Sequence, residues 1–277
     1  MSKLYLFMAL AVFGMMACGD NAGSAAQNEE GMEKFADDEE FKNEHEEPAT
    51  IAYDPQGTEI TFPTPDGKEG KAYFRAAAET SDKYLFVIHE WWGLNNHIRQ
   101  EADRLFSELE NVNVMALDLY DGKVADNRDD AGKFMGAVEE ERLNNIVKGA
   151  LAKAGASAKV ATIGWCFGGG WSLNASIARP ADATVIYYGN VTRTVDQLKK
   201  LKGPVMGHFG TQDQNINQEM VSGFEQAMQE AGKSDTLTVH WYDANQAFAN
   251  PTGARYDAED AATAWQRTTD VLGKNLS

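Results

Sequence analysis

Cysteine and clustered positive charge are both scarce in this sequence. The 277 residues include two cysteines, Cys18 and Cys166, and no basic cluster. That lack argues against nucleic-acid binding, because proteins neutralise phosphates with grouped Lys and Arg side chains. The sequence also contains no Gly-x-Gly-x-x-Gly dinucleotide loop and no Gly-Lys-Ser/Thr phosphate loop. We therefore expect no nucleic-acid partner, no cofactor and no metal.

Long apolar runs are also absent, except at the N-terminus. Residues 1–18 carry Lys3 followed by the apolar stretch Leu4 to Met16, which is short for a bilayer span and typical of a secretion signal. The run Met15-Met16-Ala17-Cys18 resembles a bacterial lipoprotein cleavage box, in which Cys18 becomes the lipidated first residue. An ordinary cleaved signal or an uncleaved anchor are the alternatives. We expect an exported protein, held on the periplasmic or cell-surface side of a bacterial membrane by its lipid alone.

The negative charge is concentrated near the N-terminus. The chain has a net charge of −17, and residues 19–50 hold eleven Asp or Glu against Lys34 and Lys42. This acidic tract, which includes His45, predicts a disordered tether over residues 19–50. Residues 51–277 form the expected folded domain, and an apolar fraction of 43% is sufficient for one core. With Cys18 lipidated, Cys166 is the only thiol left, so no intramolecular disulfide can form.

Short apolar strands alternate with helical patterns from Thr58 onward. The turn Pro65-Asp66-Gly67 predicts an opening hairpin, and Asn95 or Asn96 is suited to cap the helix that follows the third strand. The predicted strands are Thr58 to Phe62, Lys71 to Ala76, Tyr84 to His89, Val112 to Leu117, Val160 to Ile163, Ala183 to Tyr187, Pro204 to Phe209 and Leu237 to Tyr242. This alternation predicts an α/β fold with a mostly parallel central sheet flanked by helices on both faces.

The run Gly164-Trp165-Cys166-Phe167-Gly168 follows a strand and precedes a helix. This is the pattern of a nucleophile elbow with sulfur in place of the serine oxygen. The flanking glycines are expected because side chains there would collide with the neighbouring strand and helix. The helix dipole is expected to favour the thiolate of Cys166. The alternative is a buried cysteine in a glycine-rich turn.

From about Phe41 to the C-terminus, the sequence resembles the dienelactone hydrolase family of α/β-hydrolases. The matching stretches, in chain order, are His89-Glu90-Trp91-Trp92-Gly93-Leu94-Asn95, Asp118-Leu119-Tyr120, the elbow, Gly210-Thr211-Gln212-Asp213 and Ala247-Phe248-Ala249-Asn250. The resemblance implies that Cys166 is the nucleophile, Asp213 the triad aspartate and Glu90 a glutamate beside the thiol. It also implies an oxyanion hole made by the backbone N–H groups of Trp91 and Phe167.

The sequence departs from the family pattern at the catalytic histidine. The family reads Gly-Ala-Gly-His-Ala-Phe where this chain has Asp243 to Phe248, which places Gln246 at the histidine position. A glutamine side chain does not take up a proton near neutral pH, so general-base catalysis is missing there. His208 or His240 as a substitute base is the less favoured alternative, and His89 is expected to point away from the site because adjacent strand residues face opposite sides.

Three functions follow from this pattern. The leading one is hydrolysis of esters, lactones or thioesters by Cys166, with weakened or altered activity. The alternatives are a small-molecule binding or sensing lipoprotein, and a covalent trap that is acylated but does not deacylate. Trp91, Trp92 and Trp165 are expected to line the pocket, unless they are plain core residues. Asn250 stands where the family has a carboxylate-binding arginine, which makes a carboxylated dienelactone a doubtful substrate.

Overall fold

The structure is a computed structural model that describes residues 31–277. The predicted signal, Cys18 and the first part of the expected tether, residues 19–30, lie outside the described residues. Across residues 31–277, no helix is long and apolar enough to cross a membrane.

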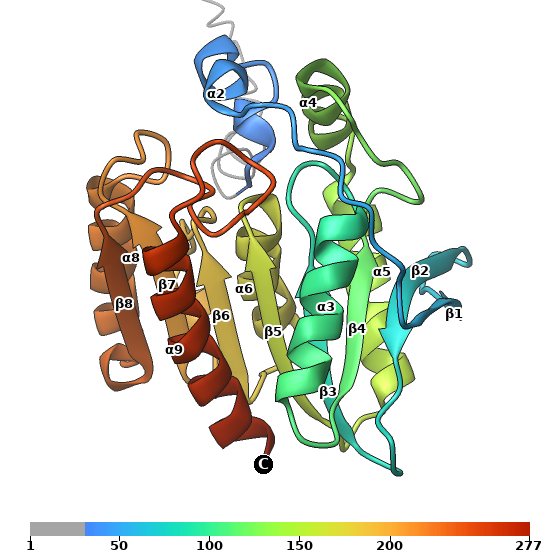
Figure 1. The fold of residues 1–277 in the computed structure, drawn as a ribbon. Coiled ribbons are helices and arrows are strands. Elements are labelled where there is room, and N and C mark those ends of the chain that lie inside the picture. The colour runs from blue at the N-terminus through green and yellow to red at the C-terminus, as the bar shows by residue number, and fades with distance from the viewer. Residues whose placement is uncertain (1–30) are drawn as a thin grey trace, which may run out of the picture.

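One eight-stranded sheet organises the described chain, in the order β1-β2-β4-β3-β5-β6-β7-β8 (Figure 1). The strands are β1 (Thr58–Pro63), β2 (Glu69–Arg75), β3 (Lys83–Ile88), β4 (Asn113–Asp118), β5 (Lys159–Trp165), β6 (Ala183–Tyr187), β7 (Val205–Gly210) and β8 (Leu237–Tyr242). The pairs β1–β2 and β2–β4 are antiparallel, and every other pair is parallel. The predicted opening hairpin and mostly parallel sheet are thus confirmed.

The burial of each strand follows its sequence pattern. All six residues of β4 and all five of β6 are buried, as expected for continuous apolar strands covered on both faces. In β2, near the edge, exposed and buried residues alternate at the start of the strand. The hydrophobic core therefore lies on both sides of the central strands, and this rigid centre supports the loops that follow them.

Helices cover both faces of the sheet. In Figure 1, α3 and α9 lie in front of the sheet, while α5, α6 and α8 lie behind it. The helical elements are η1 (Glu33–Phe35), α2 (Glu39–Glu44), α3 (Asn96–Glu108), α4 (Arg128–Gly136), α5 (Glu140–Ala154), α6 (Phe167–Ala178), α7 (Val195–Leu198), α8 (Gln218–Glu230), η2 (Ser234–Thr236) and α9 (Ala258–Leu276). Asn95 caps α3 by accepting a hydrogen bond from the Ile98 N–H.

Residues 31–50 differ from the predicted disordered tether. They contain η1 and α2, and Figure 1 shows α2 above the end of the sheet at which the parallel strands finish. Met32 and Phe41 are buried, and the Ala49 N–H donates to the carbonyl of Thr252 at 2.9 Å. Composition predicted disorder because the segment is acidic, but a few apolar side chains at the right spacing are enough to hold it on the domain. We refer to residues 31–50 as the strap.

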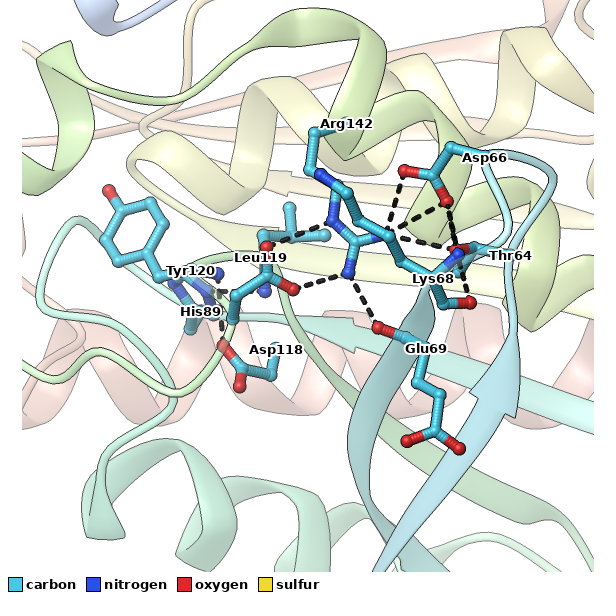
Figure 2. A network of polar contacts seen from close by, with 10 residues as sticks. Thr64, Asp66, Lys68, Glu69, His89, Asp118, Leu119, Tyr120 and Arg142 are labelled. Carbon is cyan, nitrogen blue, oxygen red and sulfur yellow. Dashed lines mark hydrogen bonds and ion pairs between the residues drawn. The ribbon is translucent and has the colours of Figure 1, made fainter.

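Arg142 of α5 joins three segments at the side of the sheet (Figure 2). Its guanidinium donates to Asp121 at 3.0 Å, to Asp66 at 3.1 Å and to the carbonyl of Glu69 at 2.6 Å. These bonds tie the β1–β2 hairpin to the loop that follows β4. That loop begins with Leu119 and Tyr120 and forms one wall of the site described next.

Candidate active site

The loops that follow the parallel strands bring the predicted site residues together at one edge of the sheet. Each side chain comes directly, or within a few residues, after a strand, and parallel strands all end at the same edge. Glu90 follows β3, Tyr120 follows β4, Cys166 follows β5, Tyr188 follows β6, Asp213 follows β7 and Gln246 follows β8.

Cys166 occupies a sharp turn between β5 and α6. Its φ of 53° and ψ of −117° lie in a region that L-residues rarely adopt, and its N–H donates to the carbonyl of Tyr187 at 2.9 Å. A Cβ at Gly168 would lie 2.2 Å from the carbonyl oxygen of Ile88 in β3. A Cβ at Gly164 would lie 2.0 Å from the carbonyl oxygen of Gly168. Gly164 and Gly168 are therefore needed, as predicted, because a side chain at either position would collide with neighbouring backbone.

The sulfur of Cys166 faces three N–H groups. The backbone N–H groups of Phe167 and Trp91 interact with it, and Gln246 donates to it from Nε2 at 3.6 Å. Burial, and secondarily the charge of Glu90, raise the pKa of the thiol, while the two backbone N–H groups oppose this increase. The structure therefore contradicts the expectation that the helix dipole makes Cys166 a thiolate at rest. The side chain is 2% exposed, and this desolvation outweighs the dipole.

Gln246 follows β8 and reaches the sulfur of Cys166. Its side chain is fully buried, and its Oε1 has no hydrogen-bond partner. The turn that carries it is held by a bond from its own N–H to Asn245 Oδ1 at 2.8 Å. Gln246 therefore touches the sulfur as a hydrogen-bond donor and offers an uncommitted carbonyl oxygen, but no group that takes up a proton near neutral pH.

Glu90 is a buried carboxylate with two side-chain donors. Asn250 donates from Nδ2 to Oε2 at 2.6 Å, and Tyr188 donates from its hydroxyl to Oε1 at 3.5 Å. Burial raises the pKa of Glu90 to about 7, although both donors lower it. Sequence reasoning missed Tyr188, because a tyrosine that ends an apolar strand reads as a core residue. Its φ of 37° is the only local sign of a special position, and it is visible only in the fold.

Asp213 lies in the turn after β7 and is 2% exposed. Its Oδ1 accepts from the N–H groups of Asn215 and Ile216, at 2.8 and 2.9 Å. Its charge is close enough to Cys166 to raise the pKa of the thiol. Asp213, expected as the triad aspartate, is therefore buried at the same edge of the sheet as Cys166, with one carboxylate oxygen held by two backbone N–H groups.

The histidines of the sheet are committed to structural contacts. His89 Nδ1 donates to the Glu90 carbonyl at 2.6 Å, and its Nε2 accepts from the Leu119 N–H at 3.1 Å. His208 is bonded through Nδ1 to the Tyr242 hydroxyl at 2.8 Å and through Nε2 to Thr268 Oγ1 at 3.1 Å. The half-buried His240 stacks on His208 with ring centroids 5.5 Å apart. None of these three rings is hydrogen-bonded to Cys166.

The two tryptophans predicted to line the pocket beside Trp91 lie in different places. Trp92 packs on Trp91, with ring centroids 4.7 Å apart. Trp165 instead packs on Tyr187 at 5.5 Å and lines a separate small hollow with Trp265 of α9. The side chain of Trp165 therefore lies away from the thiol. Trp165 and Cys166 are consecutive residues at the end of β5, and consecutive side chains of a strand point to opposite faces of the sheet.

The strap covers the site from above. Phe41 packs edge-on against Trp91 at 5.3 Å, and the His45 ring lies 4.9 Å from the same indole. Phe41 is fully buried and His45 is 7% exposed. Sequence reasoning assigned both residues to a tether and missed them; the signal was the pair of aromatic rings four residues apart on a short helical segment.

Several buried polar atoms of the site residues and of the strap have no hydrogen-bond partner. They are Trp91 Nε1, Tyr120 Oη, Gln246 Oε1 and His45 Nε2. Such atoms are rare in folded proteins, and they call for an explanation such as a catalytic role or a bound polar molecule. Among the described residues 31–277, no group of three or more His, Cys, Asp or Glu side chains is arranged to hold a metal ion.

The dienelactone hydrolase family model matches residues 71–276 of this chain. The chain belongs to the dienelactone hydrolase family. Carboxymethylenebutenolidase 1 of Cupriavidus pinatubonensis is 25% identical over 230 residues, covering 78% of this chain and 95% of that protein. Protein usf of Aquifex pyrophilus is 30% identical over 209 residues, covering 70% and 88% respectively.

Solved structures of the dienelactone hydrolase type share this fold. A dienelactone hydrolase-like promiscuous phosphotriesterase from metagenomic libraries superimposes with a TM-score of 0.64 at 20% identity, covering 79% of this chain and 98% of that one. The α/β-hydrolase fold predicted from the sequence is therefore confirmed.

Proposed function

We propose that this protein hydrolyses carboxylic esters, lactones or thioesters through an acyl-enzyme on Cys166. The observation that carries the proposal is the set of N–H groups around the sulfur, from Trp91, Phe167 and Gln246. Donors of this kind stabilise negative charge on the sulfur and, once the sulfur has attacked, on the neighbouring carbonyl oxygen. The strained turn supports the same role, because it places the side chain of Cys166 at the carboxyl end of β5, beside these N–H groups.

Glu90 is the group best suited to take the thiol proton. Its pKa of about 7 allows the carboxylate and the acid to coexist near neutral pH. In acylation, Cys166 gives its proton to Glu90, the sulfur attacks the carbonyl carbon, and the C–O bond of the ester breaks. The protonated Glu90 returns the proton to the departing alkoxide, which leaves as an alcohol. The acyl group stays on Cys166 as a thioester.

The residue at position 250 argues for a substrate that carries no carboxylate group near the bond that is cleaved. The amide of Asn250 is bonded to Glu90 and carries no positive charge. Glu90, Asp213 and the thiol make the site electronegative when ionised, so an anionic substrate group would be repelled there. We therefore propose neutral esters, lactones or thioesters rather than carboxylated dienelactones.

A binding or sensing function is the second candidate. Two observations favour it: the pKa of Cys166 is raised, and the side chain that contacts the sulfur is Gln246, which is not a base near neutral pH. A protein of this kind would hold an acyl compound between Tyr120 and Gln246 without turning it over.

Comparison of the unaltered chain with its Cys166→Ala variant separates the two functions. We expect Cys166-dependent release of nitrophenol from p-nitrophenyl acetate, lost in Cys166→Ala while the folded state persists. Equal release by both proteins would reject the hydrolase proposal. Saturable binding of the ester by both proteins, with no release above background, would favour the binding function.

We also propose that Cys18 is lipidated and anchors the protein to a bacterial membrane on the periplasmic or cell-surface side. The support is the sequence Met15-Met16-Ala17-Cys18 after a short apolar stretch. Metabolic labelling with a palmitate analogue should mark the unaltered chain and leave Cys18→Ser unmarked. Equal labelling of both chains would reject this proposal.

A further inference from the structure

The hydrogen bonding of His45 sets its tautomer. Nδ1 of His45 lies 2.7 Å from the carbonyl oxygen of Phe41, and a carbonyl oxygen only accepts, so Nδ1 carries the proton. Nε2 therefore has a lone pair, and this atom is buried with no hydrogen-bond partner. Burial lowers the pKa of His45 to about 4, which keeps the ring neutral. The ring is therefore neutral at rest with a free lone pair on Nε2, while burial makes it a weaker proton acceptor than an exposed imidazole.

Two neighbours of this ring belong to segments that also approach the thiol. The His45 ring lies 4.9 Å from the indole of Trp91, whose backbone N–H interacts with the sulfur. The second neighbour is Arg255, whose charge lowers the pKa of His45. Arg255 donates to Asn245 Oδ1 at 3.4 Å, and Asn245 immediately precedes Gln246. The strap thus packs its one histidine against Trp91, a residue whose backbone N–H interacts with the sulfur.

We propose that His45 of the strap supplies the general base that is missing at position 246, and that it acts on the water that deacylates Cys166. This inference rests on the proposed hydrolase function. Gln246 leaves the deacylation step without a proton acceptor at the family's position. His45 is the described histidine that combines contact with an oxyanion-hole residue and an uncommitted ring nitrogen.

The step balances without any further reactant. Water attacks the thioester carbon of acyl-Cys166 and gives one proton to Nε2 of His45. The C–S bond then breaks, the carboxylic acid leaves, and the sulfur departs as a thiolate that takes the proton back from the His45 imidazolium. Trp91 and Phe167 donate to the carbonyl oxygen throughout, and the step returns Cys166 to the free thiol and His45 to the neutral imidazole.

His45→Asn tests this role in the full chain, because asparagine places an N–H near the position of Nδ1 and lacks Nε2. Acetylation by p-nitrophenyl acetate and loss of the acetyl group from Cys166 are followed separately by intact-protein mass spectrometry. We expect acetylation within about threefold of the unaltered chain and deacylation slower by about 100-fold or more. His97→Asn is the matched control, since His97 is also buried, has an unpartnered Nδ1 and has a pKa lowered to about 4, but starts α3 instead of packing on Trp91.

Chemical rescue separates proton transfer from a purely structural role. Imidazole added to His45→Ala should restore deacylation in a concentration-dependent way, while acetylation stays unchanged. Deacylation at the original rate in His45→Asn, an equal slowing in His97→Asn, or no rescue by imidazole would each overturn the inference. A lack of Cys166-dependent release from the unaltered chain would instead refute the proposed function, and this inference with it.

Discussion

The side-chain amide of Gln246 donates a hydrogen bond to the sulfur of Cys166 across 3.6 Å. This contact stabilises the sulfur when it carries negative charge, but Gln246 is not a base that takes up the thiol proton near neutral pH. Glu90, with a pKa of about 7, and His45, with an uncommitted Nε2, are the two groups to which we assign proton transfer. We therefore propose that Glu90 accepts the proton in acylation and that His45 accepts it in deacylation.

The Gln246→His variant should acetylate faster than the unaltered chain. The new imidazole would stand where Gln246 contacts the sulfur, and general-base assistance contributes about 100- to 10,000-fold. The measurement is the rate of acetyl-Cys166 formation in single turnover. Gln246→Asn is the control, because it removes the contact with the sulfur without adding a base. No gain from histidine would show that the site has been reshaped for another task.

Acylation should become faster as the pH rises through about 7. Glu90 has a raised pKa of about 7, so below that pH it is protonated and cannot take the thiol proton, and above it the carboxylate is available. Single-turnover acetylation rates measured across the neutral range should show this inflection in the unaltered chain. Glu90→Gln should be slower and should lack the inflection. A persistent inflection in Glu90→Gln would assign the titration to another group.

The two donors to Glu90 should differ in their effect on that inflection. Asn250 donates at 2.6 Å and Tyr188 at 3.5 Å, and both lower the pKa of the carboxyl. Asn250→Leu should therefore move the inflection of the acylation profile to higher pH, and Tyr188→Phe should move it less in the same direction. A downward shift in either variant would mean that the donors do not stabilise the carboxylate.

Gly168→Ala should destabilise the fold by about 1–3 kcal/mol. The new Cβ would meet the Ile88 carbonyl oxygen at 2.2 Å, which forces α6 away from β3. Gly223→Ala in the exposed part of α8 meets nothing within 4 Å and should stabilise by about 0.5–1 kcal/mol. Urea unfolding of both variants gives the comparison. Equal and small effects would show that the elbow tolerates a side chain at Gly168.

Loosening the strap should expose the thiol. Phe41 is fully buried and packs edge-on against Trp91 at 5.3 Å, so Phe41→Ala removes the largest apolar anchor of residues 31–50. Alkylation of Cys166 by iodoacetamide at alkaline pH, mapped by peptide mass spectrometry, should become faster. Glu46→Gln is the control, since Glu46 belongs to the strap but is exposed. Unchanged alkylation in Phe41→Ala would mean that the strap does not limit access.

The sheet was predictable because local pattern and burial agree there. Apolar runs such as Tyr84 to His89 mark strands that are covered on both faces, and the turn Pro65-Asp66-Gly67 marks the hairpin. All eight predicted strands are present, with boundaries shifted by at most two residues. The positions of Glu90, Cys166 and Gln246 follow from the same logic, because each comes after a strand of one parallel sheet.

The remaining features depend on contacts between distant segments. The strap was predicted to be disordered from its charge, and its attachment depends on Phe41 meeting Trp91, a residue fifty positions later. The helix dipole suggested a thiolate at Cys166, but full burial decides the protonation state, and burial is a tertiary property. Trp165 was predicted to line the pocket because it precedes Cys166, but its side chain lies on the other face of the strand and lines a hollow with Trp265.

The most direct test follows protein mass and released nitrophenol together after the full chain is mixed with p-nitrophenyl acetate. The account predicts continuous release in excess of one equivalent, with a transient acetyl group that maps to Cys166 and with no release above background from Cys166→Ala. Release that continues in Cys166→Ala, or the absence of both release and an adduct on the unaltered chain, would contradict the claim that Cys166 is the nucleophile of a working hydrolase.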